Sequence, residues 1–186
     1  MTSSEAATLV LVGPMGAGKS SIGKKVAREL GVTFTDTDTV IVREHGQIPA
    51  LFDERGEAHF RALERAAVVT ALDGGGVVAL GGGAVLDAAT REDLSAHRVV
   101  LLTVAPEIVR ARIGGKGRPL LNDGDPIVRW QRIYDERRAF YEQVADVTFD
   151  SSVGRISAIA AAIAEWARAD GLTPGVSPDT VPEGSE

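Results

Sequence analysis

The sequence predicts an α/β fold in which one mostly parallel five-stranded sheet lies between two layers of helices. Two observations lead to this prediction. Short apolar runs that are typical of buried strands alternate along the chain with longer segments of helical periodicity. A glycine-rich loop directly follows the first apolar run, as in strand–loop–helix units of parallel sheets. We expect the strands at residues 8–12, 32–35, 76–80, 98–104 and 147–149.

The first strand leads into a loop that matches a phosphate-binding motif. Residues 13–20, GPMGAGKS, fill every fixed position of G-x-x-x-x-G-K-[ST]. In this motif backbone N–H groups turn toward a phosphate, Lys19 adds positive charge for the β- and γ-phosphates, and Ser20 is placed to hold Mg²⁺. The alternative is a glycine-rich turn that caps an ordinary helix. We expect nucleotide contacts from Gly13, Gly16, Ala17, Gly18, Lys19, Ser20 and Ser21.

A helix should follow this loop, and the second strand should end in two carboxylates. Apolar residues at four-residue spacing predict the helix up to Leu30. The second strand runs into Asp36, Thr37 and Asp38. Two carboxylates at one strand end could divide the work of phosphoryl transfer, so that one serves Mg²⁺ while the other faces an acceptor hydroxyl. The alternative is that Thr37 or Asp38 caps the next helix.

The third strand is continuously apolar, as expected of a buried parallel strand, and it ends in Gly81, Gly82 and Gly83. Three glycines at a strand end leave room for a ligand. Because ligands of α/β sheets bind beyond the carboxyl ends of strands, the phosphate loop, the aspartates and these glycines should share one crevice. We expect the remaining helices at residues 39–45, 48–55, 57–72, 106–113, 126–143 and 156–167.

Composition excludes several classes of protein. The 186 residues, 44% of them hydrophobic, suffice for one compact domain, which we expect at residues 1–169, with a disordered proline-rich tail at 170–186. The absence of cysteine excludes disulfides, thiolate metal sites and thiol nucleophiles. The net charge of −6 argues against broad nucleic-acid binding. No apolar run approaches the length of a membrane span, so we expect a cytoplasmic protein without a membrane partner.

From about residue 9 to residue 149 the chain resembles shikimate kinases. The resemblance rests on the phosphate loop, the two aspartates and the glycine triplet, together with Phe60-Arg61 and Glu64, the run Arg118-Pro119-Leu120-Leu121, and Arg137 four residues before Tyr141. It implies a P-loop fold of the nucleoside-monophosphate-kinase type with a mobile lid over about 113–125. It also implies a monomer that transfers the γ-phosphoryl group of ATP to the 3-hydroxyl of shikimate, with Mg²⁺, in aromatic amino-acid biosynthesis.

The resemblance also implies roles for the residues of the acceptor side. Asp38 contacts the ring hydroxyls and is the candidate base, Arg61 and Arg137 clamp the substrate carboxylate, and Gly82 and Gly83 approach the ring through their backbone. A planar guanidinium can grip a carboxylate through two hydrogen bonds, which a lysine cannot do. The alternatives are solvated helix surfaces, with Arg61 paired to a glutamate one turn earlier and Arg137 in a charged run.

On the donor side the resemblance places Asp36 with Ser20 and Lys19 around Mg²⁺ and the phosphates. Arg112 corresponds to the arginine that lies against adenine. Arg118 corresponds to the lid arginine that reaches both nucleotide phosphate and shikimate, which makes it a catalytic candidate with Asp38 and Lys19. The alternative for the lid is a surface loop with a structural Arg-Pro turn.

The departures from the family are few. The lid is about one residue shorter than in some members, Arg138 replaces a small or polar residue, and the proline that many members place against adenine is missing near residues 154–156. Trp130 and Trp166 occupy helical positions, and we assign both to packing.

Two rival functions remain. One is a kinase for another polyol acid such as gluconate, although Asp38, Arg61, Arg137 and the glycine triplet together favour shikimate. The other is a guanine-nucleotide switch. Residues 53–56 match D-x-x-G but lie in a helical stretch, and Asn122 is not followed by the lysine of the base-reading motif.

Overall fold

The structure is a computed structural model that describes residues 8–113 and 125–169. Five strands form one sheet in the order β2-β3-β1-β4-β5, and every neighbouring pair is parallel. The predicted fold class is therefore confirmed. The predicted tail, Arg118 and residues 114–124 of the predicted lid lie outside the described residues. The strands are β1 (Leu9–Val12), β2 (Phe34–Asp36), β3 (Val77–Ala79), β4 (Arg98–Thr103) and β5 (Val147–Asp150).

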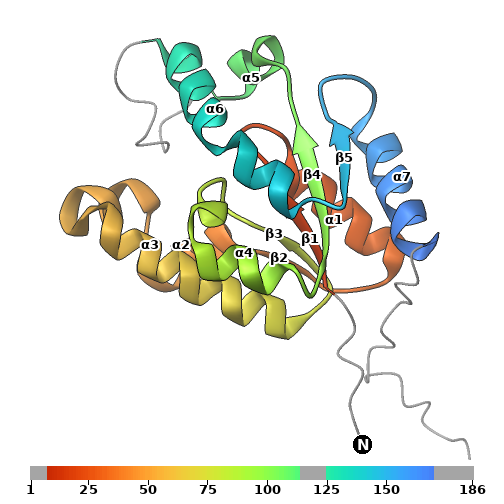
Figure 1. Cartoon of the computed structure of the whole chain (residues 1–186), viewed down its shortest axis with the longest axis horizontal. Coiled ribbons are helices and arrows are strands. Elements are labelled where there is room, and N and C mark those ends of the chain that lie inside the picture. The colour runs from red at the N-terminus through yellow and green to blue at the C-terminus, as the bar shows by residue number, and fades with distance from the viewer. Residues whose placement is uncertain (1–7, 114–124, 170–186) are drawn as a thin grey trace, which may run out of the picture.

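Helices cover both faces of the sheet (Figure 1). Side chains of β1 alternate between the faces: Leu9 and Leu11 pack into the core beneath α1 (Lys19–Leu30) and α7 (Ile156–Ala169), whereas Val10 and Val12 pack beneath α3 (Ile48–Gly74) and α4 (Ala88–Leu94). This alternation follows from the two-residue period of a strand. The sheet is therefore the middle of three layers.

The remaining helices lie around the carboxyl ends of the strands (Figure 1). They are α2 (Thr37–His45), α5 (Pro106–Ile113), α6 (Pro126–Val144) and the short 3₁₀ helix η1 (Ala84–Leu86). Side chains of α6 enter both cores, with Trp130 and Ile133 on one side of the sheet and Tyr141 on the other. Helix α6 thus spans the edge of the sheet at which the ligand-binding loops are expected.

The two helices predicted at 48–55 and 57–72 appear as the two parts of α3. Gly56 interrupts that helix with φ 81° and ψ 167°, a conformation that is rare for any residue with a Cβ. In contrast, η1 and α4 are not predicted by the apolar periodicity. Helix α4 has a cap that is visible in the sequence, because the Asp87 side chain accepts a hydrogen bond from the N–H of Thr90 at 2.8 Å.

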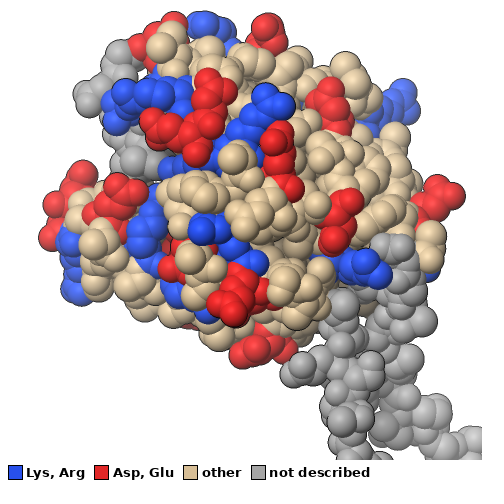
Figure 2. Space-filling view, viewed as in Figure 1, with Lys and Arg blue, Asp and Glu red and all other residues tan. Residues whose placement is uncertain are grey.

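The surface is charged on the face shown in Figure 2, where Lys and Arg side chains are interspersed with Asp and Glu. No helix of the described residues is both long enough and apolar enough to span a bilayer.

Candidate active site

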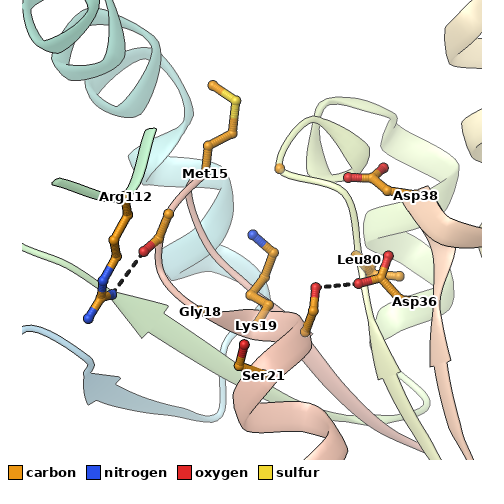
Figure 3. A pocket seen from close by; sticks show the side chains of 11 residues that line it. Met15, Gly18, Lys19, Ser21, Asp36, Asp38, Leu80 and Arg112 are labelled. Atoms are coloured by element: carbon orange, nitrogen blue, oxygen red, sulfur yellow. Dashed lines mark hydrogen bonds between the residues drawn. The ribbon is translucent and has the colours of Figure 1, made fainter. Parts of the chain in front are cut away.

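The carboxyl ends of the central strands surround one cavity of about 300 Å³. Its walls come from the loop after β1, the end of β2, the end of β3 and helix α5, so the structure brings together the three segments that the sequence places at strand ends (Figure 3). The lining residues are Met15, Gly16, Gly18, Lys19, Ser20, Ser21, Asp36, Asp38, Leu80, Gly82 and Arg112.

The phosphate loop packs tightly against the neighbouring strand β4. Gly13 has φ 141°, and a Cβ at this position would lie 2.2 Å from the carbonyl oxygen of Leu102, so only glycine fits. Lys19 opens α1 and donates from Nζ to the carbonyl oxygens of Gly13 at 2.7 Å and Pro14 at 3.0 Å. Ala17 is fully buried, so its contact with a ligand would come from the backbone. A lysine beside the N–H groups of a helix start is suited to bind an anion.

Asp36 is the last residue of β2 and the N-cap of α2. Its Oδ1 accepts a hydrogen bond from the N–H of Thr39 at 3.0 Å, and its Oδ2 accepts one from the Ser20 hydroxyl (Figure 3). The capping residue is thus Asp36 and not Thr37 or Asp38, and the two aspartates are not both extended, because Asp38 lies in the first turn of α2. The helix begins two residues earlier than predicted.

The Ser20 hydroxyl and the Asp36 carboxylate are hard oxygen ligands of the kind that Mg²⁺ prefers. Within the described ranges there is no group of three or more His, Asp or Glu side chains that could hold a metal ion. Mg²⁺ beside substrate phosphates is usually held by only one or two protein oxygens together with phosphate and water. The pair therefore fits a magnesium ion that arrives with a nucleotide.

Asp38 faces the cavity from the side opposite Arg112 (Figure 3). Burial, followed by the negative charges of Asp36 and Glu64, raises the pKa of Asp38 to about 6, against the opposing effect of the Lys19 and Arg61 charges. Such a carboxyl is mostly ionised at neutral pH and is a stronger base than an exposed aspartate. It is therefore suited to accept a proton from a hydroxyl.

Thr37 links the ends of two strands, a role that the sequence analysis does not identify. Its side chain is fully buried, its hydroxyl donates to the carbonyl oxygen of Ala79 at 3.4 Å, and the same oxygen accepts from the N–H of Gly81 at 3.1 Å. These bonds fix the acidic segment relative to the glycine triplet. A threonine between two aspartates at a strand end is the available signal in the sequence.

Arg61 extends from the second part of α3 toward the glycine triplet. Its Nη1 donates to Glu64 at 2.6 Å, and its Nη2 donates to Glu57 at 3.1 Å. The alternative pairing with a glutamate one turn earlier is therefore present, but it coexists with a contact to a buried carboxylate, since Glu64 is only 3% exposed. A Cβ on Gly83 would lie 2.0 Å from Nη1 of Arg61. The guanidinium thus lies directly against the backbone of the triplet.

Glu64 lies beside Arg61, Asp38 and the glycine triplet. A Cβ on Gly81 would lie 2.7 Å from Oε1 of Glu64 and 2.6 Å from Oδ1 of Asp38. Burial raises the pKa of Glu64, while the positive charges of Arg61 and Arg137 act to lower it. Two guanidinium groups therefore act electrostatically on one buried carboxylate.

Arg137 is buried, with 7% of its surface exposed, so the alternative of a solvated helix face is wrong for this residue. Its positive charge acts on Tyr141, whose hydroxyl donates to the carbonyl oxygen of Gly82. Burial raises the pKa of Tyr141 to about 12. The arginine is thus held close to the glycine triplet.

Two further contacts involve the phosphate loop. Arg112 donates from Nη1 to the carbonyl oxygen of Gly16 at 3.0 Å and from Nη2 to that of Ser151 at 3.3 Å. Trp130 is buried as predicted, and its Nε1 also donates to the carbonyl oxygen of Met15 at 2.8 Å, a contact that the packing assignment does not include.

The comparisons with known proteins identify the family. The model of the shikimate kinase family matches residues 15–168. The chain belongs to the shikimate kinase family. It is therefore an ATP-dependent kinase, and the expected resemblance is confirmed.

Two shikimate kinases illustrate the similarity in sequence. The one from Halorhodospira halophila is 45% identical over 163 residues, which cover 84% of this chain and 91% of that protein. The one from Streptomyces coelicolor is 48% identical over 140 residues, which cover 74% of this chain and 81% of that protein.

Solved structures agree with this assignment. Shikimate kinase from Acinetobacter baumannii, solved in complex with shikimate, is 33% identical with a TM-score of 0.85 and covers 90% of this chain and 96% of its own. Deoxyadenosine kinase from M. mycoides, solved with bound dATP, is 16% identical with a TM-score of 0.59 over 86% of this chain and 98% of its own, and this likeness shows a shared fold alone. The chain thus has the fold of P-loop kinases.

Proposed function

We propose that this chain transfers the γ-phosphoryl group of ATP to the 3-hydroxyl of shikimate, which gives shikimate 3-phosphate and ADP. One observation carries the proposal. A single cavity is lined by Lys19 of the phosphate loop and by Asp38, and the glycine triplet brings Arg61 close to Asp38. The family membership and the shikimate bound to the Acinetobacter baumannii relative support the same conclusion.

The acceptor binds through its carboxylate and its hydroxyls. Arg61 and Arg137 bind the carboxylate of shikimate, because the Arg61 guanidinium lies against Gly83 and both arginines place positive charge near Glu64 beside the glycine triplet. Backbone atoms of Gly82 and Gly83 contact the ring. With the carboxylate fixed, we expect the 3-hydroxyl to lie toward Asp38 and the phosphate loop, where it would be oriented for transfer.

The donor binds along the phosphate loop. Backbone N–H groups of Gly13, Gly16, Ala17 and Gly18 bind the phosphates together with Lys19, Ser20 and Ser21. Lys19 exchanges its present carbonyl partners for the β- and γ-phosphates, which are stronger acceptors because they are charged. Arg112 lies against the adenine ring of ATP. We also propose that Arg118, which lies outside the described residues, reaches both substrates.

Ser20 and Asp36 would hold Mg²⁺. When bound, this ion neutralises charge on the β- and γ-phosphates and thereby favours phosphoryl transfer. The residues suit the ion because a hydroxyl and a carboxylate already lie within hydrogen-bond contact of each other at the phosphate loop.

Asp38 serves as the base of the transfer. The 3-hydroxyl oxygen forms a bond to the γ-phosphorus while the bond between that phosphorus and the β-bridging oxygen breaks, and the hydroxyl proton moves to a carboxylate oxygen of Asp38. A pKa of about 6 keeps this carboxylate ionised at neutral pH yet basic enough to take the proton. The charge of ADP as leaving group is stabilised by Lys19 and the loop N–H groups.

We propose that the chain acts as a monomer formed by one domain at residues 1–169. We place the enzyme in the cytoplasm, because the reaction belongs to aromatic amino-acid biosynthesis, and we propose no nucleic-acid or membrane partner. Sedimentation of the purified chain at one protomer mass would agree with the monomer, and a stable dimer would contradict it.

The substrate is tested with a panel of acceptors. We expect the purified full chain with ATP and Mg²⁺ to release ADP rapidly when shikimate is added, and not when gluconate or a nucleoside monophosphate is added. Equal rates with gluconate would overturn the assignment of the acceptor.

A further inference from the structure

Helix α6 is hydrogen-bonded to both ligand-binding loops through two side chains. Trp130 donates from Nε1 to the carbonyl oxygen of Met15 in the phosphate loop at 2.8 Å, and the Tyr141 hydroxyl donates to the carbonyl oxygen of Gly82 in the glycine triplet. The two residues lie about three helical turns apart on α6. Helix α6 is therefore hydrogen-bonded both to the phosphate loop, where the nucleotide would bind, and to the glycine triplet, where the acceptor would bind.

Aromatic rings fill the space between these two contacts. The rings of Trp130 and Tyr134 stack with centroids 5.4 Å apart and planes at 15°, and those of Tyr134 and Tyr141 stack at 6.4 Å and 24°. Trp130 and Tyr141 are each only 1% exposed. Because close-packed interiors deform little, this column of rings should hold the two hydrogen-bonding groups at a constant separation.

The two accepting carbonyls belong to loops that nearly touch each other. Met15 and Gly82 both line the cavity, and a Cβ on Gly82 would lie 3.6 Å from the backbone nitrogen of Met15 and 3.6 Å from the carbonyl oxygen of Gly13. A small displacement of either loop therefore changes the distance between the sites for the nucleotide phosphates and the acceptor. Misplacement by about 1 Å can lower the rate of a positioned reaction about 100-fold.

We propose that Trp130 and Tyr141 are positioning residues that act together as one brace, which sets the separation between the phosphate loop and the glycine triplet. The inference rests on the proposed function, because the brace matters only if both loops bind the two reactants. Neither residue has to touch the reacting atoms. If either hydrogen bond is lost, α6 is hydrogen-bonded to only one of the two loops.

The hydroxyl of Tyr141 is suited to this role because its direction is fixed. Burial raises its pKa to about 12, so the hydroxyl keeps its proton over the whole working range of pH. The hydroxyl hydrogen points at the carbonyl oxygen of Gly82, and the positive charge of Arg137 acts on the same hydroxyl. Tyr141 thus connects the triplet to α6 and to the buried arginine.

The test is a double-mutant cycle with Trp130→Phe and Tyr141→Phe, each of which removes a donor and retains a ring. We expect each single variant to lower kcat about 10-fold, with the KM values for ATP and shikimate within about 2-fold of the wild type. We expect the double variant to be no slower than the slower single variant, because either loss alone disconnects the brace. Trp166→Phe makes the same chemical change on α7 and should leave kcat unchanged.

Other outcomes overturn the brace. If the single variants keep the wild-type kcat, the hydrogen bonds serve only folding. If the losses multiply in the double variant, each residue fixes its own loop independently. If Tyr141→Phe raises only the KM for shikimate, Tyr141 acts through Arg137.

If Trp130→Phe fails to fold, the brace is tested with Tyr141→Phe alone. Its single-turnover rate of transfer is compared with that of the wild type, and its affinity for shikimate is measured by calorimetry. If the wild type shows no shikimate-dependent release of ADP, the proposed function itself is wrong. If the wild type and the variants are equally active, only the proposed brace is wrong.

Discussion

The guanidinium of Arg61 lies against the backbone of Gly83 so closely that a Cβ on this glycine would stand 2.0 Å from Nη1. The same guanidinium is held by Glu64, which is itself buried between Arg61 and the triplet. The position of the arginine therefore depends on the absence of a side chain at the end of the neighbouring loop.

Gly83→Ala tests this dependence. The added methyl group displaces the guanidinium, so we expect the KM for shikimate to rise about 10-fold or more, in line with the loss of one charged hydrogen-bonded contact, while the KM for ATP changes little. Gly74→Ala is the control, because a Cβ at Gly74 meets no atom within 4 Å. An unchanged KM for shikimate in Gly83→Ala would show that Arg61 does not bind the acceptor.

Ser20→Ala tests the proposed magnesium ligands. Loss of the hydroxyl removes one oxygen ligand and the partner of Asp36, so the Mg²⁺ concentration for half-maximal activity should rise about 10-fold or more. This change is cleaner than Asp36→Asn, because Asp36 also caps α2. Ser95→Ala, at the end of α4 and outside the cavity lining, should leave the Mg²⁺ dependence unchanged. An equal Mg²⁺ requirement in Ser20→Ala would exclude this hydroxyl as a ligand.

The acid limb of the pH–activity profile should report Asp38. Because its pKa is raised to about 6, the carboxylate form is lost as the pH falls through about 6. We expect kcat/KM for shikimate to fall about 10-fold for each pH unit below that value. A profile that stays flat down to pH 5 would mean that the group required in its ionised form has an ordinary carboxyl pKa.

The same pKa predicts how stability depends on pH. The pKa of Asp38 lies above its ordinary value of 3.8, so the folded chain binds this proton more tightly than the unfolded chain does. The stabilisation from this group is therefore present below about pH 4 and lost as the pH rises through about 6. Urea unfolding should find Asp38→Asn more stable than the wild type at pH 7 by about 1–3 kcal/mol, and nearly equal to it at pH 4. A less stable variant at pH 7 would contradict the raised pKa.

Much of the fold could be predicted because it depends on local patterns. Apolar runs locate the strands to within two residues, and Gly56 divides the long helical segment where the sequence predicts two helices. The short helices at residues 84–94 carry few apolar residues with regular spacing, so periodicity does not detect them.

Part of the site could also be predicted, because it too depends on local patterns in the sequence. The phosphate loop and the glycine triplet are continuous motifs, and the topology of a parallel sheet brings their strand ends together. The hydrogen bond of Trp130 to Met15 joins residues 115 positions apart, and that of Tyr141 to Gly82 joins residues 59 positions apart. Such contacts depend on how α6 packs across the sheet, which no local pattern describes.

The central claim is that one cavity holds donor and acceptor and that Asp38 accepts the proton of the acceptor hydroxyl. Its most direct test is the transfer of a radiolabelled γ-phosphoryl group from ATP to shikimate by the wild type and by Asp38→Asn, with ATP affinity measured by calorimetry. We expect labelled shikimate from the wild type, transfer at least about 100-fold slower in the variant, and nearly unchanged ATP affinity. Wild-type chain that leaves shikimate unlabelled, or a variant that transfers the label at close to the wild-type rate, would contradict the account.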